Sequence, residues 1–333
     1  MIWMKRNLYL NQNGRLHRKE STIYYYSTEG RKIVPVNQVK AVFAVGRISV
    51  TSGVLSFFSK IGIPIHFFGY YGNYEGSFYP RRKLISGYAV LNQAAAHLDG
   101  ERRLHLARAF VSACIKNMIS VVESYVPRRG QIAETPLALG SIVDEVENAS
   151  TIPILMSMEG RAWSVYYDSF NHIIRCFEMG PRVKRPPNNP VNALISFGNS
   201  LLYSAVLTQI YHTQLDPSIS FLHEPLERRF SLALDISEVF KPGLVDMLIF
   251  KLLNRAQIRE EHFDKELNYC VLSEEGRRLF LTAFDDTIRA TNRHPRLKRK
   301  VSNEYLLRLD CYKILRNITE AKPFRPFLMS TGG

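Results

Sequence analysis

Residues 38–69 read QVKAVFAVGRISVTSGVLSFFSKIGIPIHFFG and decide the fold of the first part of the chain. Two runs in it, QVKAVFAV and IPIHFFG, are rich in β-branched and aromatic residues and predict strands. Between them, residues 51–62 place apolar side chains at helical spacing, and Gly62 stands just beyond that pattern. The stretch therefore predicts two strands joined by one short crossover helix.

Strand-forming sequence of the same kind extends back toward the N-terminus. Further short runs of strand formers, separated by Asn, Gly and Pro, are RNLYL, STIYYYS and RKIVPV. After the second strand comes GNYEGSFYPRRK, whose glycines, proline and basic residues are typical of an exposed connector. We therefore predict a small, mostly β domain over residues 1–80, followed by a linker at residues 81–88.

Beyond residue 88 the apolar residues recur every three or four positions, which predicts helices. The longest such runs are HLDGERRLHLARAFVSACIKNMISVVESY and NALISFGNSLLYSAVLTQIYH. PRVKRPPNNP has four prolines in ten positions and predicts an irregular, basic loop between helices. The expected fold class is α+β, with a small N-terminal mostly β domain followed by a larger all-α domain over residues 89–333.

Composition limits the classes of function. A chain of 333 residues with 46% hydrophobic residues can bury a substantial core, and its formal net charge of +14, spread along the chain, favours a polyanionic partner. Its four cysteines show no CxxC or metal-finger spacing and indicate buried thiols of a reducing compartment. The longest apolar run, residues 61–68, is too short to span a bilayer. We therefore expect a cytoplasmic protein with no membrane partner.

Four ionisable residues lie within otherwise apolar, helix-forming segments: Glu159, His223, Asp235 and Glu238. A carboxylate is costly to bury unless it is paired or ligated, so such acids need a partner. Asp235 and Glu238 are three apart, which places both carboxylates on one face of a helix. His223 lies close before Pro225 and is expected in a turn. Carboxylates with one imidazole suit Mg²⁺ or Mn²⁺, and the imidazole favours Mn²⁺.

Each of these residues also has an ordinary structural interpretation. Glu159 could form an ion pair with Arg102 or Arg161 on a helix surface, and His223 could be a hydrogen-bonded loop histidine. The acidic pair could be a helix N-cap and its capping-box partner. Spacing along the chain leaves both interpretations open.

Four blocks of sequence, in one order, resemble the CRISPR-associated integrase and endonuclease Cas one, which acts in spacer acquisition. These blocks are VFAVGRISVTSGVLSFFSKIGIPIHFF, LMSMEGRAWSVYY, NPVNALISFGNSLLY and SFLHEPLERRFSLALDISEVFKPGLVD. The likeness covers nearly the whole chain and includes a β domain followed by an α domain. The order of a Glu, a PVNA segment, a His and an acidic pair ahead of a basic residue and proline is highly specific.

The resemblance implies a set of site residues. Glu159, His223 and Glu238 would ligate one divalent ion, Mg²⁺ or Mn²⁺, and Asp235 would be a supporting catalytic acid. Glu238 stands where members of the family often carry Asp, so the ligand type is kept on a longer arm. Lys241 matches a basic position before the proline and would face a DNA phosphate.

Other residues are expected to support the site or to hold DNA. Asn192 matches the PVNA asparagine and would pack helices or support the ligands. Arg182, Lys184 and Arg185 of the basic loop are expected to contact phosphates, as are basic residues in GERRLHLARAF, YVPRRG and RHPRLKRK. The alternative for each basic residue is a role in keeping the surface charged and soluble.

The resemblance also implies the reaction. The protein would be a metal-dependent DNA endonuclease and integrase of CRISPR adaptive immunity, which inserts short fragments, the spacers, into a CRISPR array. A 3′-hydroxyl attacks a phosphodiester in line in this transesterification. Implied partners are double-stranded DNA, as spacer precursor and CRISPR repeat, a second copy of the chain bound through the β domain, and the small protein Cas two. The alternatives are a metal-dependent nuclease on branched DNA or RNA, and a non-catalytic nucleic-acid-binding scaffold.

Overall fold

The computed structural model describes residues 5–81, 84–184, 186–225, 230–266, 268–294 and 297–329. The chain folds into two compact units, neither of which is continuous in sequence. Unit 1 comprises Met1–Lys83, Val183–Ser204 and Arg259–Asp285, and unit 2 comprises Leu84–Arg182, Ala205–Ile258 and Asp286–Gly333. The domains expected at 1–80 and 89–333 stay a prediction, because compactness alone does not show which parts fold independently.

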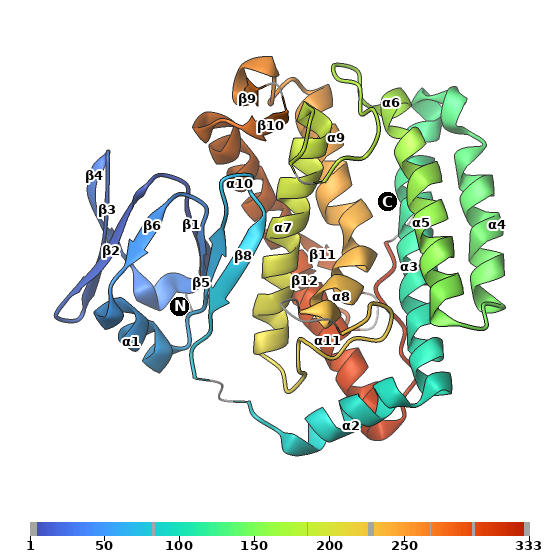
Figure 1. Ribbon diagram of the computed structural model, residues 1–333, viewed down its shortest axis with the longest axis horizontal. Coiled ribbons are helices and arrows are strands. Elements are labelled where there is room, and N and C mark those ends of the chain that lie inside the picture. Colours follow the sequence, from blue (N-terminus) through green and yellow to red (C-terminus); the bar gives the residue numbers. More distant parts are fainter. Residues whose placement is uncertain are drawn as a thin grey trace. The chain divides into compact units, whose positions relative to one another are not determined.

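Unit 1 contains two four-stranded sheets, ordered β1-β5-β7-β8 and β4-β3-β2-β6 (Figure 1). Their strands are β1 (Arg6–Leu10), β2 (Gly14–Lys19), β3 (Thr22–Ser27), β4 (Gly30–Val34), β5 (Val39–Ala44), β6 (Ile48–Val50), β7 (Ile65–Phe68) and β8 (Tyr74–Phe78). In the first sheet β1, β5 and β7 are parallel and β8 is antiparallel. In the second sheet β2, β3 and β4 form an antiparallel meander, and β6 pairs with β2 in parallel.

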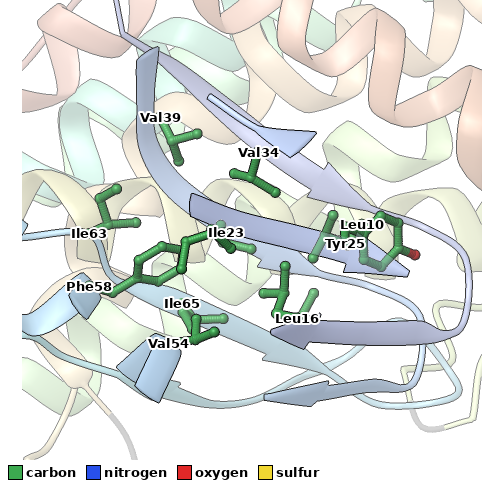
Figure 2. Packing of buried hydrophobic residues seen from close by; sticks show 12 residues of the cluster. Leu10, Leu16, Ile23, Tyr25, Val34, Val39, Val54, Phe58, Ile63 and Ile65 are labelled. Atoms are coloured by element: carbon green, nitrogen blue, oxygen red, sulfur yellow. The ribbon is translucent and has the colours of Figure 1, made fainter. Parts of the chain in front are cut away.

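The predicted crossover helix is α1 (Ser52–Ile61). It ends at Gly62, whose φ of 78° lies in the left-handed region that glycine adopts without strain. Because β5 and β7 are parallel neighbours, the chain must cross over between them, and α1 lies in that connection. Val54 and Phe58 of α1 are fully buried in a cluster with side chains of both sheets (Figure 2). The strand, helix and strand predicted for this stretch are confirmed.

Among β1–β8, three strands were not predicted, for physical reasons that differ. β8 lies within the segment expected to be an exposed connector, and that expectation is wrong for Tyr74–Phe78 because these residues pair with β7. β2 carries one apolar residue, the fully buried Leu16, among basic and small residues, so its alternation is hard to recognise. β6 has only three residues. The strands β2, β6 and β8 form because they pair with neighbouring strands, rather than because of their local sequence.

Unit 2 is mostly helical. Its helices are α2 (Gly87–Leu98), α3 (Gly100–Tyr125), α4 (Thr135–Glu147), α5 (Ile152–Asp168), α6 (Phe170–Ile173), α8 (Ser231–Lys241), α9 (Met247–Asn254) and α11 (Asn303–Glu320). The long helix α3 packs against α2, α4, α5 and α8, and so forms the centre of the unit (Figure 1). Two further helices, α7 (Pro190–Tyr211) and α10 (Glu274–Arg289), each contribute residues to both units.

The expected α+β class is confirmed, with a strand-rich N-terminal region followed by a mostly helical region. Two short hairpins interrupt the helices: β9 (Phe263–Glu266) with β10 (Tyr269–Leu272), and β11 (Thr291–Arg293) with β12 (Lys300–Ser302). The described part of the predicted basic loop contains no helix or strand between α6 and α7. α7 begins at Pro190, where the Asn189 side chain accepts a hydrogen bond from the Asn192 N–H at 2.8 Å.

Two helical stretches, Gly100–Arg128 and Pro190–Tyr211, are long and apolar enough by composition to cross a membrane. The apolar window of the second is 83% buried, as expected of a core helix in a folded protein. Cytoplasmic localisation stays an expectation.

Candidate metal centre

Asp235 lies inside α8 and holds the loop that carries His223. Its carboxylate, which is fully buried, accepts hydrogen bonds from the backbone N–H groups of Phe221, Leu222 and His223 at 2.7, 3.0 and 3.0 Å. The same carboxylate lies 2.8 Å from Nδ1 of the His223 ring. A carboxylate beside Nδ1 makes this nitrogen the donor, so the lone pair of the neutral ring lies on Nε2. Asp235 therefore fixes both the position and the tautomer of His223.

The capping-box interpretation of Asp235 and Glu238 is wrong. α8 begins at Ser231, its N-cap is Phe230, and no side chain caps it. Both acids lie in the helix interior, as their spacing on one face requires. His223 lies in a bend before α8, as expected.

Glu159 lies on the buried face of α5, and its side chain accepts a hydrogen bond from Trp163 Nε1 at 3.1 Å. Neither arginine proposed as its alternative partner binds it. Arg161 pairs with Glu145, and Arg102 donates to the carbonyl of Ile318. The ion-pair interpretation of Glu159 is therefore wrong, and the residue is a buried acid that faces the interior of unit 2.

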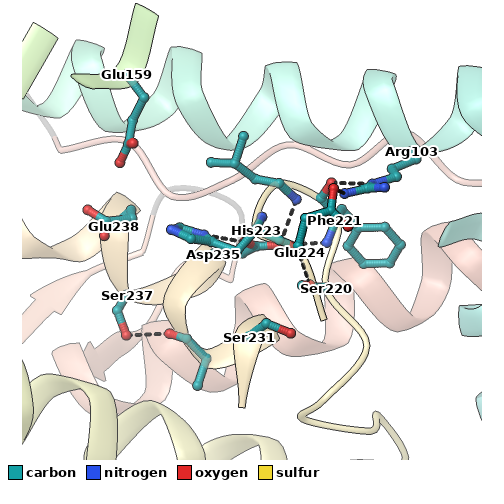
Figure 3. Close-up of polar contacts among 12 residues, drawn as sticks. Arg103, Glu159, Ser220, Phe221, His223, Glu224, Ser231, Asp235, Ser237 and Glu238 are labelled. Carbon is teal, nitrogen blue, oxygen red and sulfur yellow. Dashed lines mark hydrogen bonds and ion pairs between the residues drawn. The ribbon is translucent and has the colours of Figure 1, made fainter. Parts of the chain in front are cut away.

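Glu238 and Lys241 form an ion pair one turn apart at the end of α8. One carboxylate oxygen of Glu238, Oε1, contacts the Lys241 ammonium, while the buried Oε2 has no hydrogen-bond partner in the part of the chain that the structure describes. The ammonium also lies over the Trp163 ring, 5.6 Å from its centroid. Figure 3 shows the carboxylates of Glu159 and Glu238 and the ring of His223 turned toward one another.

The charges of these residues act on one another. Burial, and then the Glu238 carboxylate, raise the pKa of Glu159 to about 7, while Lys241 and His223 oppose the shift. Burial lowers the pKa of His223, but the Asp235 carboxylate outweighs it, so this pKa is raised. Burial likewise lowers the pKa of Lys241, and Glu238 and Glu159 reverse the effect. These five side chains therefore form one electrostatic cluster, with three acids against one histidine and one lysine.

The end of α8 is held in place by α3 and by the C-terminal segment. Pro242 has no N–H, so it ends the regular helix and begins a π-helical turn, Pro242–Asp246. The Asn117 side-chain amide of α3 donates to the Val239 carbonyl at 2.7 Å and accepts from the Met329 N–H at 2.8 Å. The Phe327 ring stacks on Phe240 at 4.8 Å. These contacts fix the helix turn that carries Glu238.

The side chains of Glu159, His223 and Glu238 suit a divalent cation by the chemistry of their ligand atoms rather than by the present distances between them. Among the described residues, no three His, Cys, Asp or Glu side chains stand close enough together to hold a metal ion as they are. The chemistry of the set nevertheless fits, because two carboxylates and an imidazole of fixed tautomer face one another and Glu238 Oε2 lacks a described partner. The Lys241 ammonium now supplies the positive charge that a cation would bring.

Comparison with known proteins shows which family the chain belongs to. The family model described as "CRISPR associated protein Cas1" matches residues 8–286. The CRISPR-associated endonuclease Cas1 3 of Thermodesulfovibrio yellowstonii is 43% identical over 97% of this chain and 98% of that protein. The chain belongs to the Cas1 family.

Two solved structures share the fold of this chain. A CAS1 protein from Thermotoga maritima is 38% identical, with a TM-score of 0.84 over 94% of this chain and 97% of that chain. A casposase bound to integration product is 18% identical, with a TM-score of 0.86 over 98% of this chain and 95% of that chain. The second likeness shows the fold alone.

The structure brings together some of the site residues predicted for this Cas1-family protein. Glu159, His223, Asp235, Glu238 and Lys241 all belong to unit 2 and lie close together. Their roles as ligands, supporting acid and phosphate contact stay predictions.

The residues expected to contact DNA or to support the site lie in different parts of the structure and differ in burial. Arg182 is half-buried in unit 2, where its charge opposes the rise that burial causes in the pKa of Asp246. Lys184 is exposed in unit 1, and Asn192 is fully buried in the first turn of α7 in the same unit, where its side chain donates to Asn188 at 3.0 Å. Arg185 lies outside the described residues.

Sequence reasoning missed two residues of this Cas1-family site. Trp163 binds Glu159 and lies under Lys241, and nothing in its spacing indicates this. Asp246 is fully buried, and burial raises its pKa to about 7 against the opposing charge of Lys241. An acid within the apolar run PGLVDMLIF is the same signal that identified Glu159, so Asp246 could have been found.

These pKa shifts predict that the metal-free protein loses stability as pH rises from about 5 to 8. The pKa of Glu159 and of Asp246 in the folded state is about 7, so both carboxyls keep their protons up to about pH 7. Carboxyls of the unfolded chain release their protons at about pH 4. Between these two pH values the folded state therefore binds more protons than the unfolded state. His223, with its raised pKa, adds stability below its unfolded pKa that is lost as pH rises through the folded pKa, which gives the same sign. We expect Tm in EDTA to be lower at the higher pH by roughly 5 °C.

Differential scanning calorimetry at constant ionic strength measures this effect. Asp246→Asn, which cannot ionise, should flatten the slope of Tm against pH. A Tm that rises across this range would contradict the assignment of proton-holding buried acids.

Proposed function

We propose that this protein is a divalent-metal-dependent DNA endonuclease and integrase, which joins the 3′ end of a short DNA fragment to a phosphodiester of a CRISPR repeat. One observation carries the proposal. Two buried carboxylates, Glu159 and Glu238, face a His223 ring whose tautomer is fixed by Asp235. Family membership and the endonuclease named above support the same reaction.

Glu159, Glu238 and Nε2 of His223 would hold one Mg²⁺ or Mn²⁺ ion. When bound, such an ion polarises a phosphoryl oxygen and stabilises the charge that develops during in-line attack by a 3′-hydroxyl. Three protein ligands leave coordination positions for DNA oxygens and water. Asp235 contributes by orientation, since all of its described hydrogen bonds hold the His223 loop and ring.

Lys241 has two roles in this proposal. In the metal-free protein its ammonium neutralises Glu238 and opposes the rise that burial and Glu238 cause in the pKa of Glu159. With both carboxylates on a cation, the Lys241 ammonium would be free to pair with a phosphate of the DNA. The side chain is 15% exposed and lies on the flat face of Trp163, so it can be reached without unfolding the site.

Partners and location are part of the same proposal. The net charge of +14 suits double-stranded DNA as spacer precursor and repeat. A second copy of the chain, bound through the strand-rich region, and the small protein Cas two complete the assembly in the cytoplasm.

The test is a joining assay with the small partner present. Labelled fragments with a free 3′-hydroxyl are incubated with a supercoiled plasmid that carries a CRISPR repeat, in Mg²⁺, in Mn²⁺ or in EDTA. The matched control is the same fragment ending in a 3′-deoxynucleotide. Label joined to the plasmid only from the hydroxyl-ended fragment supports the integrase. Cleavage with both fragments favours a nuclease on branched DNA or RNA, and no reaction favours a non-catalytic scaffold.

A substitution at Lys241 separates its two roles. Lys241→Met keeps much of the stem volume but removes the charge, so the two carboxylates lose their internal counter-ion. We expect Mn²⁺ to bind roughly tenfold more tightly, because one buried positive charge no longer competes with it. DNA joining should fall at saturating metal. Electron paramagnetic resonance of free Mn²⁺ measures the first effect, and unchanged or weaker Mn²⁺ binding would contradict the competition.

A further inference from the structure

The buried face of α5 carries a row of side chains that continues beyond Glu159. Trp163 and Tyr166 follow it at helical spacing, and Phe170 begins α6 just after the end of α5. Tyr166 and Phe170 are fully buried, and Trp163 is half-buried. The Tyr166 ring packs between the other two rings, with its centroid 5.7 Å from that of Trp163 and 5.1 Å from that of Phe170. We call these four residues the first column.

A second column lies on the segment that runs from α8 to α9. Its members, in chain order, are Glu238, Lys241, Asp246 and Phe250. The Lys241 ammonium lies 5.6 Å from the ring centroid of Trp163. The Phe250 ring packs edge to face on Phe170, with the centroids 4.6 Å apart. Contacts between the two columns therefore follow the same order along both segments.

Asp246 is the member of the second column that corresponds to Tyr166. It follows Lys241 and precedes Phe250, just as Tyr166 stands between their two partners in the first column. Burial, and then the charge of Asp246, raise the pKa of Tyr166. Burial also raises the pKa of Asp246, and Tyr166 opposes that rise. Each group therefore acts on the other inside the helix interface.

The π-helical turn Pro242–Asp246 explains why Asp246 reaches this side of the segment. Asp246 follows Glu238 by eight positions, whereas an α-helix returns to the same side after about seven. A π-helical turn takes up one extra residue, so it turns Asp246 toward the side that Glu238 occupies. In a regular helix Val245 would stand there instead, and Tyr166 would face an apolar side chain.

Both members of this pair carry a buried oxygen that needs a partner. The Tyr166 hydroxyl and Oδ2 of Asp246 have no hydrogen-bond partner in the part of the chain that the structure describes. A buried polar atom without a partner is costly, so the phenol and the carboxyl each offer the group that the other requires. Any shift of α5 along α8 and α9 would separate them, and would also move Glu159 away from Glu238 (Figure 3).

We propose that Tyr166 and Asp246 are positioning residues, which hold α5 and α8 in the register that places Glu159 opposite Glu238. Neither residue belongs to the proposed ligand set, and both act through the helices that carry it. The proposal rests on the proposed function only for the cation that these carboxylates bind.

The Trp163 indole reports this register without metal or DNA. Trp3→Phe leaves Trp163 as the only tryptophan of the chain. In that background Tyr166→Phe removes one oxygen, and Asp246→Leu removes the carboxyl at similar volume. Each should move the Trp163 emission in EDTA to longer wavelength, because a looser interface admits water to the half-buried indole. Asp246→Asn, whose amide can both donate to and accept from the phenol, should keep the parental emission.

Mn²⁺ titration followed by electron paramagnetic resonance measures the consequence for the site. Tyr166→Phe and Asp246→Leu should each weaken Mn²⁺ binding roughly tenfold, because residues that orient metal ligands carry effects of that size. The double variant should lose little more than either single variant, since both changes break the same contact. The control is Tyr25→Phe in unit 1, which removes a hydroxyl that donates to the Gln12 carbonyl at 2.6 Å. It should leave emission and Mn²⁺ binding at the parental values.

The two measurements separate this proposal from the proposed function. Thermal unfolding shows whether each variant is folded, and Tyr166→Phe is sufficient by itself if Asp246→Leu does not fold. The positioning role is overturned if Tyr166→Phe matches Tyr25→Phe in emission, or if it binds Mn²⁺ as tightly as the parent protein. A shifted emission in a protein whose parent binds no Mn²⁺ would support the register and count against the proposed function.

Discussion

Glu238→Gln is expected to abolish divalent-metal binding and to lower DNA joining by roughly a thousandfold, because several kcal/mol of transition-state stabilisation depend on the metal. The substitution preserves shape and removes one negative charge. It replaces an oxygen that has no hydrogen-bond partner among the described residues with an amide that binds metal poorly. It also weakens the hold of Glu238 on Lys241, which leaves that ammonium buried against Trp163.

Two measurements check this expectation. Titration of Mn²⁺ followed by electron paramagnetic resonance reports metal binding, and the joining assay reports chemistry. Glu145→Gln is the matched control, since Glu145 is a half-exposed acid of α4 that pairs with Arg161 outside the site. Retained Mn²⁺ affinity in Glu238→Gln, together with normal joining, would show that the metal is held elsewhere.

Asp235→Ala is expected to destabilise the folded protein by about 4 kcal/mol, because removal of a buried acceptor leaves its donors unsatisfied. Three backbone N–H groups and the His223 ring lose their common partner, and the N–H groups of Phe221 and Leu222 belong to buried residues. The loop before α8 should then become mobile, so that joining fails even below the unfolding temperature.

Urea unfolding measures the loss as a fall in the midpoint with little change in slope. Asp144→Ala, at an exposed position of α4, is the control and should stay within about 0.5 kcal/mol of the parent. Asp235→Asn gives a milder comparison, in which nitrogen-15 spectra of labelled histidine should show a loss of the Nδ1–H tautomer of His223. A stable Asp235→Ala protein with an unchanged tautomer would contradict the positioning role.

Local sequence was sufficient to predict an element where the pattern of apolar residues is strong and those residues are themselves part of the core. The runs around β1, β3, β5 and β7, and the helix α1 with Val54 and Phe58 on its inner side, could be predicted because their side chains form the core directly. β2 and β8 could not, because their strands are specified by pairing with neighbouring strands rather than by their own composition. His66 lies in a predicted strand, yet its full burial against Ser77, which accompanies a pKa lowered to about 3, depends on β8.

For the candidate site, too, the sequence determined some features and the tertiary structure decided the others. The sequence by itself determined which acids and which histidine stand in apolar surroundings, and the order of these residues was enough to indicate the family. Only the tertiary structure decided which partner each one has: Trp163 for Glu159, the His223 loop for Asp235, and Lys241 for Glu238. The reason is physical. The cost of burying a charge is a local property of the chain, whereas the group that offsets this cost comes from whichever helix packs against it.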